Sequence, residues 1–184
     1  MAPRLQVRDR ETLFAQFPGL STEDLGNALI HSAARASAAV GGAVGAWAVL
    51  PVVPAFPVEV ATETLALVAI EIRLVAELHE VYGVRPPGST VDRMTAYVAA
   101  WATRRGVALA PGGLILAAGS PLRKRLQRRL AARAGRSAVS LGPLLTGAAA
   151  GALVNRWETR RLGEEVHADL RRRLATVPGW HPGH

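Results

Sequence analysis

The chain has no cysteine in its 184 residues, so disulfide bonds, thiolate nucleophiles and cysteine metal sites are excluded. Aromatic residues make up only 5% of the sequence, and lysine occurs once among 22 basic residues. Hydrophobic residues still reach 49%, and alanine supplies much of that content, while glycine occurs 18 times. Small side chains are therefore expected to dominate the core and to let helices approach closely.

An uninterrupted apolar run of membrane-spanning length is also missing. The charge-free stretch at residues 36–58 is broken by Pro51, Pro54 and Pro57, and its alanines and glycines favour insertion only weakly. The first twenty residues carry several charges and no apolar run of the secretory type. We therefore expect a cytoplasmic protein that is at most peripheral to the inner face of the membrane.

Capping residues and prolines divide the chain into helices. Ser21 and Asp24 form a capping-box pair that predicts a helix from residue 22, and the three prolines then separate it from a helix at about 58–82. Ser89 with Asp92 predicts the start of a third helix. Pro143 suits the first turn of a last helix that extends to about residue 175. We therefore predict an all-α fold, a single helical bundle with closely packed Ala/Gly-rich helices and a long C-terminal helix.

The predicted bundle occupies residues 21–177, between an N-terminal arm at 1–20 and a flexible tail at 178–184. Helical periodicity assigns faces within it. The helix at 58–82 has a polar face comprising Glu59, Glu63, Arg73, Glu77 and Glu80. The apolar stripe of the third helix comprises Val91, Met94, Val98 and Trp101, and that of the last helix comprises Leu144, Leu145, Ala148, Ala152, Leu162, Val166, Leu170 and Leu174.

Two pairs of glycines at four-residue spacing mark close helix contacts. Gly41 and Gly45 lie on the first long helix, and Gly147 and Gly151 lie on the last. No Gly-Lys-Ser/Thr follows either pair, so neither resembles a phosphate-binding loop. Their matching small surfaces predict that the two helices pack against each other, and similar surfaces would also suit a homo-oligomer.

Charge is distributed unevenly along the chain. Residues 1–100 have a net charge of −3, whereas residues 101–184 have a net charge of +11. The strongest feature is a run of seven cations without an acidic neighbour: Arg123, Lys124, Arg125, Arg128, Arg129, Arg133 and Arg136. With leucines at 122, 126 and 130 opposite, the run fits an interfacial helix at an anionic membrane, although a solvated helix face has the same pattern. Nucleic acid is disfavoured because no aromatic side chains interleave with the cations.

Motifs for catalysis or for metal binding are not recognisable. There is no Gly-x-Ser-x-Gly elbow and no obvious Ser, His, Asp set. Glu164 and His167 form one Glu-x-x-His pair, whereas a di-iron bundle needs two such pairs and two more carboxylates. Glu71 and His79 lie toward the apolar side of their helix, where a structural carboxylate or a core histidine is the commoner role. No cofactor is predicted, and binding is favoured over catalysis.

Three segments resemble the EcsC family of helical, membrane-associated bacterial proteins. The first is the Ala/Gly-rich stretch at residues 33–50, and the second is PVEVATETLALVAIEIRLVAELHEVYG at residues 57–83. The third is SLGPLLTGAAAGALVNRWETRRLGEEVHADLRRRL at residues 140–174. The resemblance covers roughly half the chain. It implies a helical fold close to a membrane and implies no catalytic residues.

Together these features lead to one functional hypothesis and one rival. The leading hypothesis is a non-enzymatic, peripheral membrane-interacting protein that binds anionic lipid surfaces in a scaffolding or regulatory role. The rival is a soluble protein-interaction domain that docks an acidic partner through its basic C-terminal half.

Overall fold

The computed structural model describes residues 6–47, 56–106 and 143–176, with only the backbone described at 43–47, 56–64, 143–148 and 150. Its helices are α1 (Arg10–Gln16), α2 (Thr22–Trp47), α3 (Phe56–Val81), α4 (Thr90–Arg105) and α6 (Pro143–Ala175). The predicted all-α bundle is confirmed, and its long C-terminal helix α6 has 33 residues. None of the helices in the described ranges combines the length and the apolar character needed to cross a membrane.

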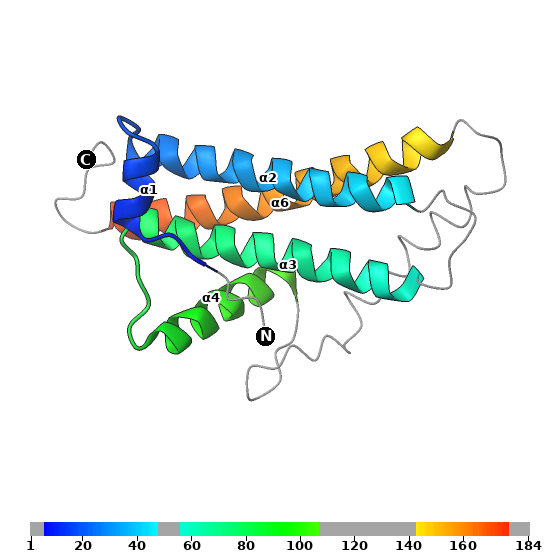
Figure 1. Ribbon diagram of the computed structural model, residues 1–184. Helices are drawn as coiled ribbons and strands as arrows, with labels where there is room; N and C mark the ends of the chain where they lie inside the picture. Colours follow the sequence, from blue (N-terminus) through cyan, green and yellow to red (C-terminus); the bar gives the residue numbers. More distant parts are fainter. Residues whose placement is uncertain (1–5, 48–55, 107–142, 177–184) are drawn as a thin grey trace.

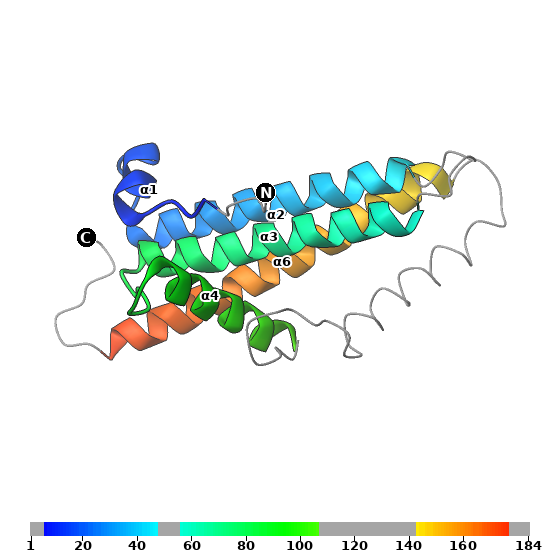
Figure 2. The ribbon, with the colours of Figure 1, turned by 60° about the horizontal axis from the view of Figure 1, so that its bottom comes forward.

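Three long helices form the body of the bundle. α2 runs in the opposite direction to α3 and α6, and the three lie side by side in both views (Figure 1 and Figure 2). The most extensive contacts in the described bundle are those between α2 and α6. α4 lies against α3, and α1 lies at the end of the bundle where α2 begins and α3 ends. α6, at about 50 Å, is the longest element and extends along the whole bundle.

Local capping explains where these helices begin and end. The backbone N–H of Asp24 donates to the Ser21 hydroxyl over 3.1 Å, and α2 begins at Thr22, as the sequence predicts. Ser89 and Asp92 form a reciprocal capping box at the start of α4, also as predicted. Gly83 follows α3 with a φ of 67°, a left-handed conformation that costs glycine little and other residues more.

The core is formed by one apolar stripe from each long helix. Leu162, Val166 and Leu170 of α6 are buried, as their predicted stripe requires. The other helices contribute, among others, Leu25, Leu29 and Ile30 of α2, Ile72, Val75 and Leu78 of α3, and Trp101 of α4. The prediction for Val91 is wrong, because this side chain is 74% exposed. Val91 lies in the first turn of α4, and the core contacts of that helix begin one turn later, at Met94.

Residues 10–16 correct the predicted domain boundary at residue 21. They form α1, whose first turn is capped by Asp9 through a 2.9 Å hydrogen bond from the backbone N–H of Thr12. Leu13 is completely buried in the core, and Phe14 and Phe17 pack against it. The folded bundle therefore begins before residue 21. A seven-residue helix has few buried positions, so no helical period is visible there in the sequence.

Candidate functional site

Several predicted site residues fall outside the described part of the chain. The seven cations at residues 123–136 lie there, as do the helix expected to carry them and the tail at 178–184. Gly45 and Gly147 belong to α2 and α6, at positions where only the helical backbone is described. The described residues therefore test two of the four packing glycines, Gly41 and Gly151. The role of the basic run stays a prediction.

Gly41 of α2 lies directly against Gly151 of α6, so two of the four predicted packing glycines meet. A Cβ atom added to Gly41 would lie 2.5 Å from Nδ2 of Asn155 and 2.9 Å from the carbonyl oxygen of Gly151. Both distances are well below normal van der Waals contact, so the two backbones can approach this closely only around glycine. The next residue differs, because a Cβ atom on Gly42 would meet its nearest neighbour, Cβ of Ala152, at 3.9 Å.

The outer face of α6 carries three exposed apolar side chains within little more than one turn. Leu153, Val154 and Trp157 are 64%, 43% and 60% exposed, and we refer to them as the α6 patch. At 100° per residue Leu153 and Trp157 lie on the side of the helix opposite the buried Leu162 and Val166, and Val154 lies between the two sides. Single exposed apolar residues are normal on a protein surface, whereas adjacent ones suggest a contact surface. The other large exposed hydrophobic side chains of the described chain are separate, on α3, on α4 and before α2.

Arginines surround the α6 patch. The guanidinium carbon of Arg161 lies 5.6 Å from the ring centroid of Trp157, within the range of a cation–π contact. Arg156 and Arg160 are exposed on the same part of the helix. Arg161 also pairs with Glu165 at 2.9 Å, one turn further along. The patch thus combines apolar, aromatic and cationic groups on one surface, and its acidic neighbours lie toward the C-terminal side.

A buried carboxylate in the middle of α3 links four helices. Glu71 accepts hydrogen bonds from Nε1 of Trp101 at 2.8 Å and from Nε of Arg105 at 2.9 Å, both on α4. The hydroxyl of Thr159 on α6 lies 3.1 Å from the same carboxylate and 2.8 Å from the hydroxyl of Ser37 on α2. The predicted structural role of Glu71, paired with an arginine, agrees with this geometry.

Glu77 and Glu80 differ from their predicted place on a polar face, because both are buried. Glu77 receives Arg8 from the segment before α1 at 2.7 Å and Arg73 from the preceding turn at 2.8 Å. Burial by itself would raise the pKa of Glu77, but the hydrogen bonds from the two arginines outweigh it and hold the pKa below its usual value. Arg8, from a segment outside α3, therefore helps to cover this face, together with Arg73 of α3 itself.

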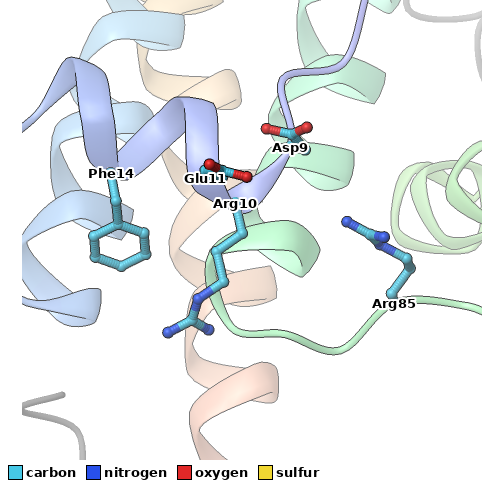
Figure 3. Close-up of a pocket in the computed structure, with 5 residues that line it drawn as sticks. All are labelled: Asp9, Arg10, Glu11, Phe14 and Arg85. Carbon is cyan, nitrogen blue, oxygen red and sulfur yellow. The ribbon is translucent and has the colours of Figure 1, made fainter.

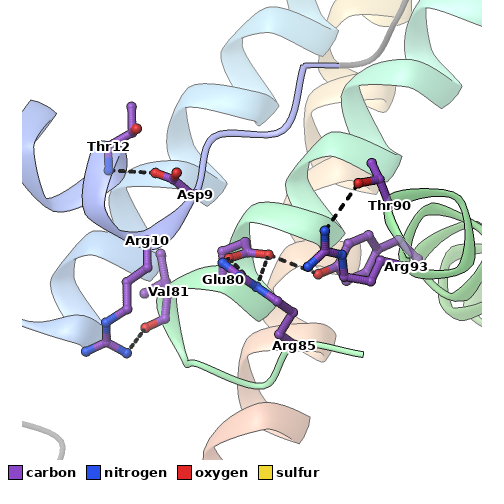
Figure 4. A network of polar contacts seen from close by, with 9 residues as sticks. Asp9, Arg10, Thr12, Glu80, Val81, Arg85, Thr90 and Arg93 are labelled. Atoms are coloured by element: carbon purple, nitrogen blue, oxygen red, sulfur yellow. Dashed lines mark hydrogen bonds and ion pairs between the residues drawn. The ribbon is translucent and has the colours of Figure 1, made fainter. Parts of the chain in front are cut away.

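Glu80 is held in the same way near the end of α3. Nε of Arg85, in the loop before α4, donates to both carboxylate oxygens at 3.0 and 3.1 Å (Figure 4). The Tyr97 hydroxyl donates to Glu80 from α4 at 3.3 Å. Burial, followed by the adjacent negative charge, raises the pKa of Tyr97 to about 12. The loop after α3 and the helix α4 are thus fixed to one carboxylate.

These three glutamates have a structural role. Each is paired with an arginine from another part of the chain, and further donors occupy its oxygens. A carboxylate that acts as a general base must reach a substrate proton, whereas these oxygens face the protein interior. Removing one partner of such a buried pair strongly destabilises the folded protein, because the other partner is left as an uncompensated buried charge.

A depression near α1 is lined by Asp9, Arg10, Glu11, Phe14 and Arg85, with a volume of about 640 Å³ (Figure 3). It is open to solvent, and its lining contains two acidic and two basic groups. Arg10 already donates to the carbonyl oxygen of Val81 at 2.9 Å and lies over the Phe14 ring. Arg85 is engaged by Glu80. The cations of this depression are therefore committed to holding α1 and the loop against α3.

Of the two histidines of the predicted metal candidates, His79 is half-buried and His167 is buried. Nδ1 of His79 lies 2.7 Å from the carbonyl oxygen of Val75, and burial lowers the pKa of its ring. His167 is buried beside Tyr82, and its Nε2 has no hydrogen-bond partner among the described residues. Glu164, by contrast, is exposed and pairs with Arg160. Within the described ranges no three potential ligands cluster as a metal site would require.

The α6 patch was not expected from the sequence, because the predicted apolar stripe of the last helix contains none of its three residues. A usable signal was present. Leu153, Trp157 and Arg161 recur at four-residue spacing, opposite the stripe formed by Leu162 and Val166. A large aromatic residue on the polar side of an amphipathic helix indicates a surface contact more often than a core position.

Comparison with protein-family models, with curated proteins and with solved structures gives no match to this chain. The resemblance to the EcsC family therefore stays a prediction.

Proposed function

We propose that this protein binds anionic lipid surfaces through its basic C-terminal half and acts there as a non-enzymatic scaffold or regulator. The distribution of charge is the observation that supports it. The described residues contain all 14 acidic side chains and 14 of the 22 basic ones, so the bundle is neutral overall. The net charge of +8 therefore comes from Arg4 and the seven cations of residues 123–136.

Ion pairing within the bundle strengthens the contrast between the neutral bundle and the basic residues 123–136. At least ten of its arginines lie within 4.0 Å of a carboxylate oxygen, among them Arg8, Arg85 and Arg105. Opposite charges held this close largely cancel beyond the Debye length, which is about 8 Å at physiological ionic strength. An approaching anionic surface is therefore attracted mainly by residues 123–136.

Lipid suits this segment better than an acidic protein does. Leucines at 122, 126 and 130 recur at helical spacing beside the cations. A membrane interface accepts both kinds of group at once, because cations meet the headgroups while apolar side chains enter the acyl boundary. An acidic protein surface would have to supply a matching apolar groove as well as the charge.

The test is flotation of the full chain with vesicles of phosphatidylcholine, with and without phosphatidylserine. The parent protein should float only with the anionic vesicles, and less at high salt. Reversal of Arg125, Arg128 and Arg129 to Glu should abolish flotation. Each cation contributes about 1 kcal/mol at such a surface, so losing three weakens binding by at least about a hundredfold.

A second triple variant provides the matched control. Arg35, Arg172 and Arg173 are exposed in the bundle, and reversing them to Glu changes the net charge by the same amount. This control should retain most of the flotation. If both triple variants lose binding equally, net charge rather than the segment is responsible. If the parent chain does not float with anionic vesicles, the lipid proposal is rejected and docking to an acidic protein becomes the preferred hypothesis.

A further inference from the structure

We propose that the α6 patch, Leu153, Val154 and Trp157, is a membrane-insertion site that enters the acyl boundary of an anionic leaflet. This inference rests on the proposed function and adds a second contact, within the folded bundle, to the basic segment. Basic residues attract the protein to the headgroups, whereas exposed apolar side chains are needed to hold it at a defined depth.

The chemistry of the patch matches the interface between headgroups and acyl chains. Tryptophan is enriched at that level because its ring is apolar and its N–H remains able to donate a hydrogen bond. Arg156 is exposed beside the Trp157 ring, so a cation lies near the lipid phosphates when the ring is inserted, while Arg161 lies over the ring and is paired with Glu165. Leucine and valine on the same turn supply the apolar contact.

The position of the patch limits how deep it can enter. Leu153 and Trp157 are one helical turn apart, about 6 Å along the axis. Glu158, which is half-buried, directly follows Trp157. Glu164 and Glu165, which an anionic leaflet would repel, lie about two turns further along, and both are paired with arginines. Insertion is therefore shallow and involves one turn of α6, with the C-terminal part of the helix held away from the surface.

A second copy of the chain is a weaker candidate for the occupant. With the exposed fractions above, three side chains of this kind present roughly 300 Å². A stable protein interface buries about 800 Å² on each partner. Of its described neighbours on α6, Ala149 is exposed but small, and Arg156, Glu158 and Arg160 are charged, so the described apolar area is too small for such a contact. A fluid bilayer needs no complementary shape and accepts a small patch.

The absence of cysteine allows a direct test. Leu153→Cys places a single environment-sensitive fluorophore in the patch of the full chain, and Val91→Cys places the same label at an equally exposed site on α4. With anionic vesicles, the label at 153 should shift to the blue and brighten several-fold. A doxyl group near the top of the acyl chain should quench it. The label at 91 should show neither effect.

A binding measurement without a label completes the test. Trp157→Ala should weaken partitioning to anionic vesicles about tenfold, whereas Val91→Ala should change it less than twofold. If the parent floats but the label at 153 does not respond, the insertion site is rejected while the proposed function stands. The insertion site is also rejected if the label at 153 is already blue-shifted without lipid, because another part of this chain then covers the patch. A blue shift that appears as the protein concentration rises rejects it too, because a second copy then covers the patch. If nothing floats, both proposals fail.

Discussion

Gly41 and Gly42 are adjacent on α2 but differ in what an added methyl group would meet. Alanine at position 41 would place its Cβ 2.5 Å from Nδ2 of Asn155, and 2.9 and 3.0 Å from the backbone oxygen and carbon of Gly151. A side chain such as Asn155 can move, but a backbone carbonyl in the middle of α6 cannot move without its helix. Gly41→Ala must therefore push α2 and α6 apart.

Two opposing effects determine how much each substitution changes the free energy of unfolding. Replacing glycine by alanine inside a helix gains up to about 1 kcal/mol, since the unfolded chain loses freedom and helix propensity improves. Overpacking a tight contact costs about 1–3 kcal/mol. Gly41→Ala should therefore destabilise the protein by roughly 1–2 kcal/mol. At Gly42 the nearest atom to an added Cβ is 3.9 Å away, so Gly42→Ala should retain most of the stabilisation that alanine brings to a helix.

Thermal unfolding followed by circular dichroism compares the two variants directly. In a domain of this size 1 kcal/mol corresponds to about 2–4 °C in Tm. Gly41→Ala should lower the Tm by about 2–8 °C, and Gly42→Ala should raise it by up to about 4 °C. The two substitutions have the same chemistry and neighbouring positions. The difference between their Tm values therefore measures the effect of the close contact between Gly41 and Gly151. Equal melting temperatures would refute the close approach of α2 and α6 at Gly151.

Three further predictions concern buried polar groups. Arg105→Ala should destabilise the protein by about 3 kcal/mol in urea titration, because Glu71 loses its cation, and adding Glu71→Gln should recover more than half. Burial lowers the pKa of His79 and of His167 below 6.5, so the unfolded chain binds protons first and stability falls as the pH drops from about 7 to 5. His79→Gln/His167→Gln should flatten that slope, and a flat profile in the parent would contradict the burial. Burial raises the pKa of both tyrosines of the chain to about 12, so absorbance titration should detect tyrosinate near pH 12 in the folded protein and near about 10 in urea.

The local signals in the sequence predicted most of the fold. The pairs Ser21/Asp24 and Ser89/Asp92 located the starts of α2 and α4, because capping depends on residues only three positions apart. Pro143 marked the first residue of α6. The buried positions Leu162, Val166 and Leu170 of α6 followed from helical periodicity, whereas the stripe side chains at 144, 145 and 148 lie outside the described residues. These predictions succeeded where the cause lies within one or two turns of the chain.

The interior polar contacts could not be predicted in the same way. Arg8 is 69 residues from Glu77, and Arg105 is 34 residues from Glu71. Nothing in the sequence near α3 indicates that these partners approach. A helical wheel assigns Glu77 to a polar face, and only the fold shows that arginines carried by other segments cover that face. α1 was missed for a different reason, because a seven-residue helix has only one fully buried position, Leu13, and shows no helical period.

Salt concentration should separate folding from binding, because the charges of the bundle and those of residues 123–136 are placed differently. Within the bundle, carboxylates such as Glu71 and Glu77 are buried against arginines, and buried pairs are screened only weakly. Residues 123–136 contain no acidic side chain, so their attraction to an anionic surface acts through solvent and decays over the Debye length. Between about 0.1 and 1 M salt that length falls from about 10 Å to 3 Å. Over this range the protein should leave anionic vesicles while its Tm changes little. A Tm that fell together with binding would show that the same charges serve both, and would contradict the separation.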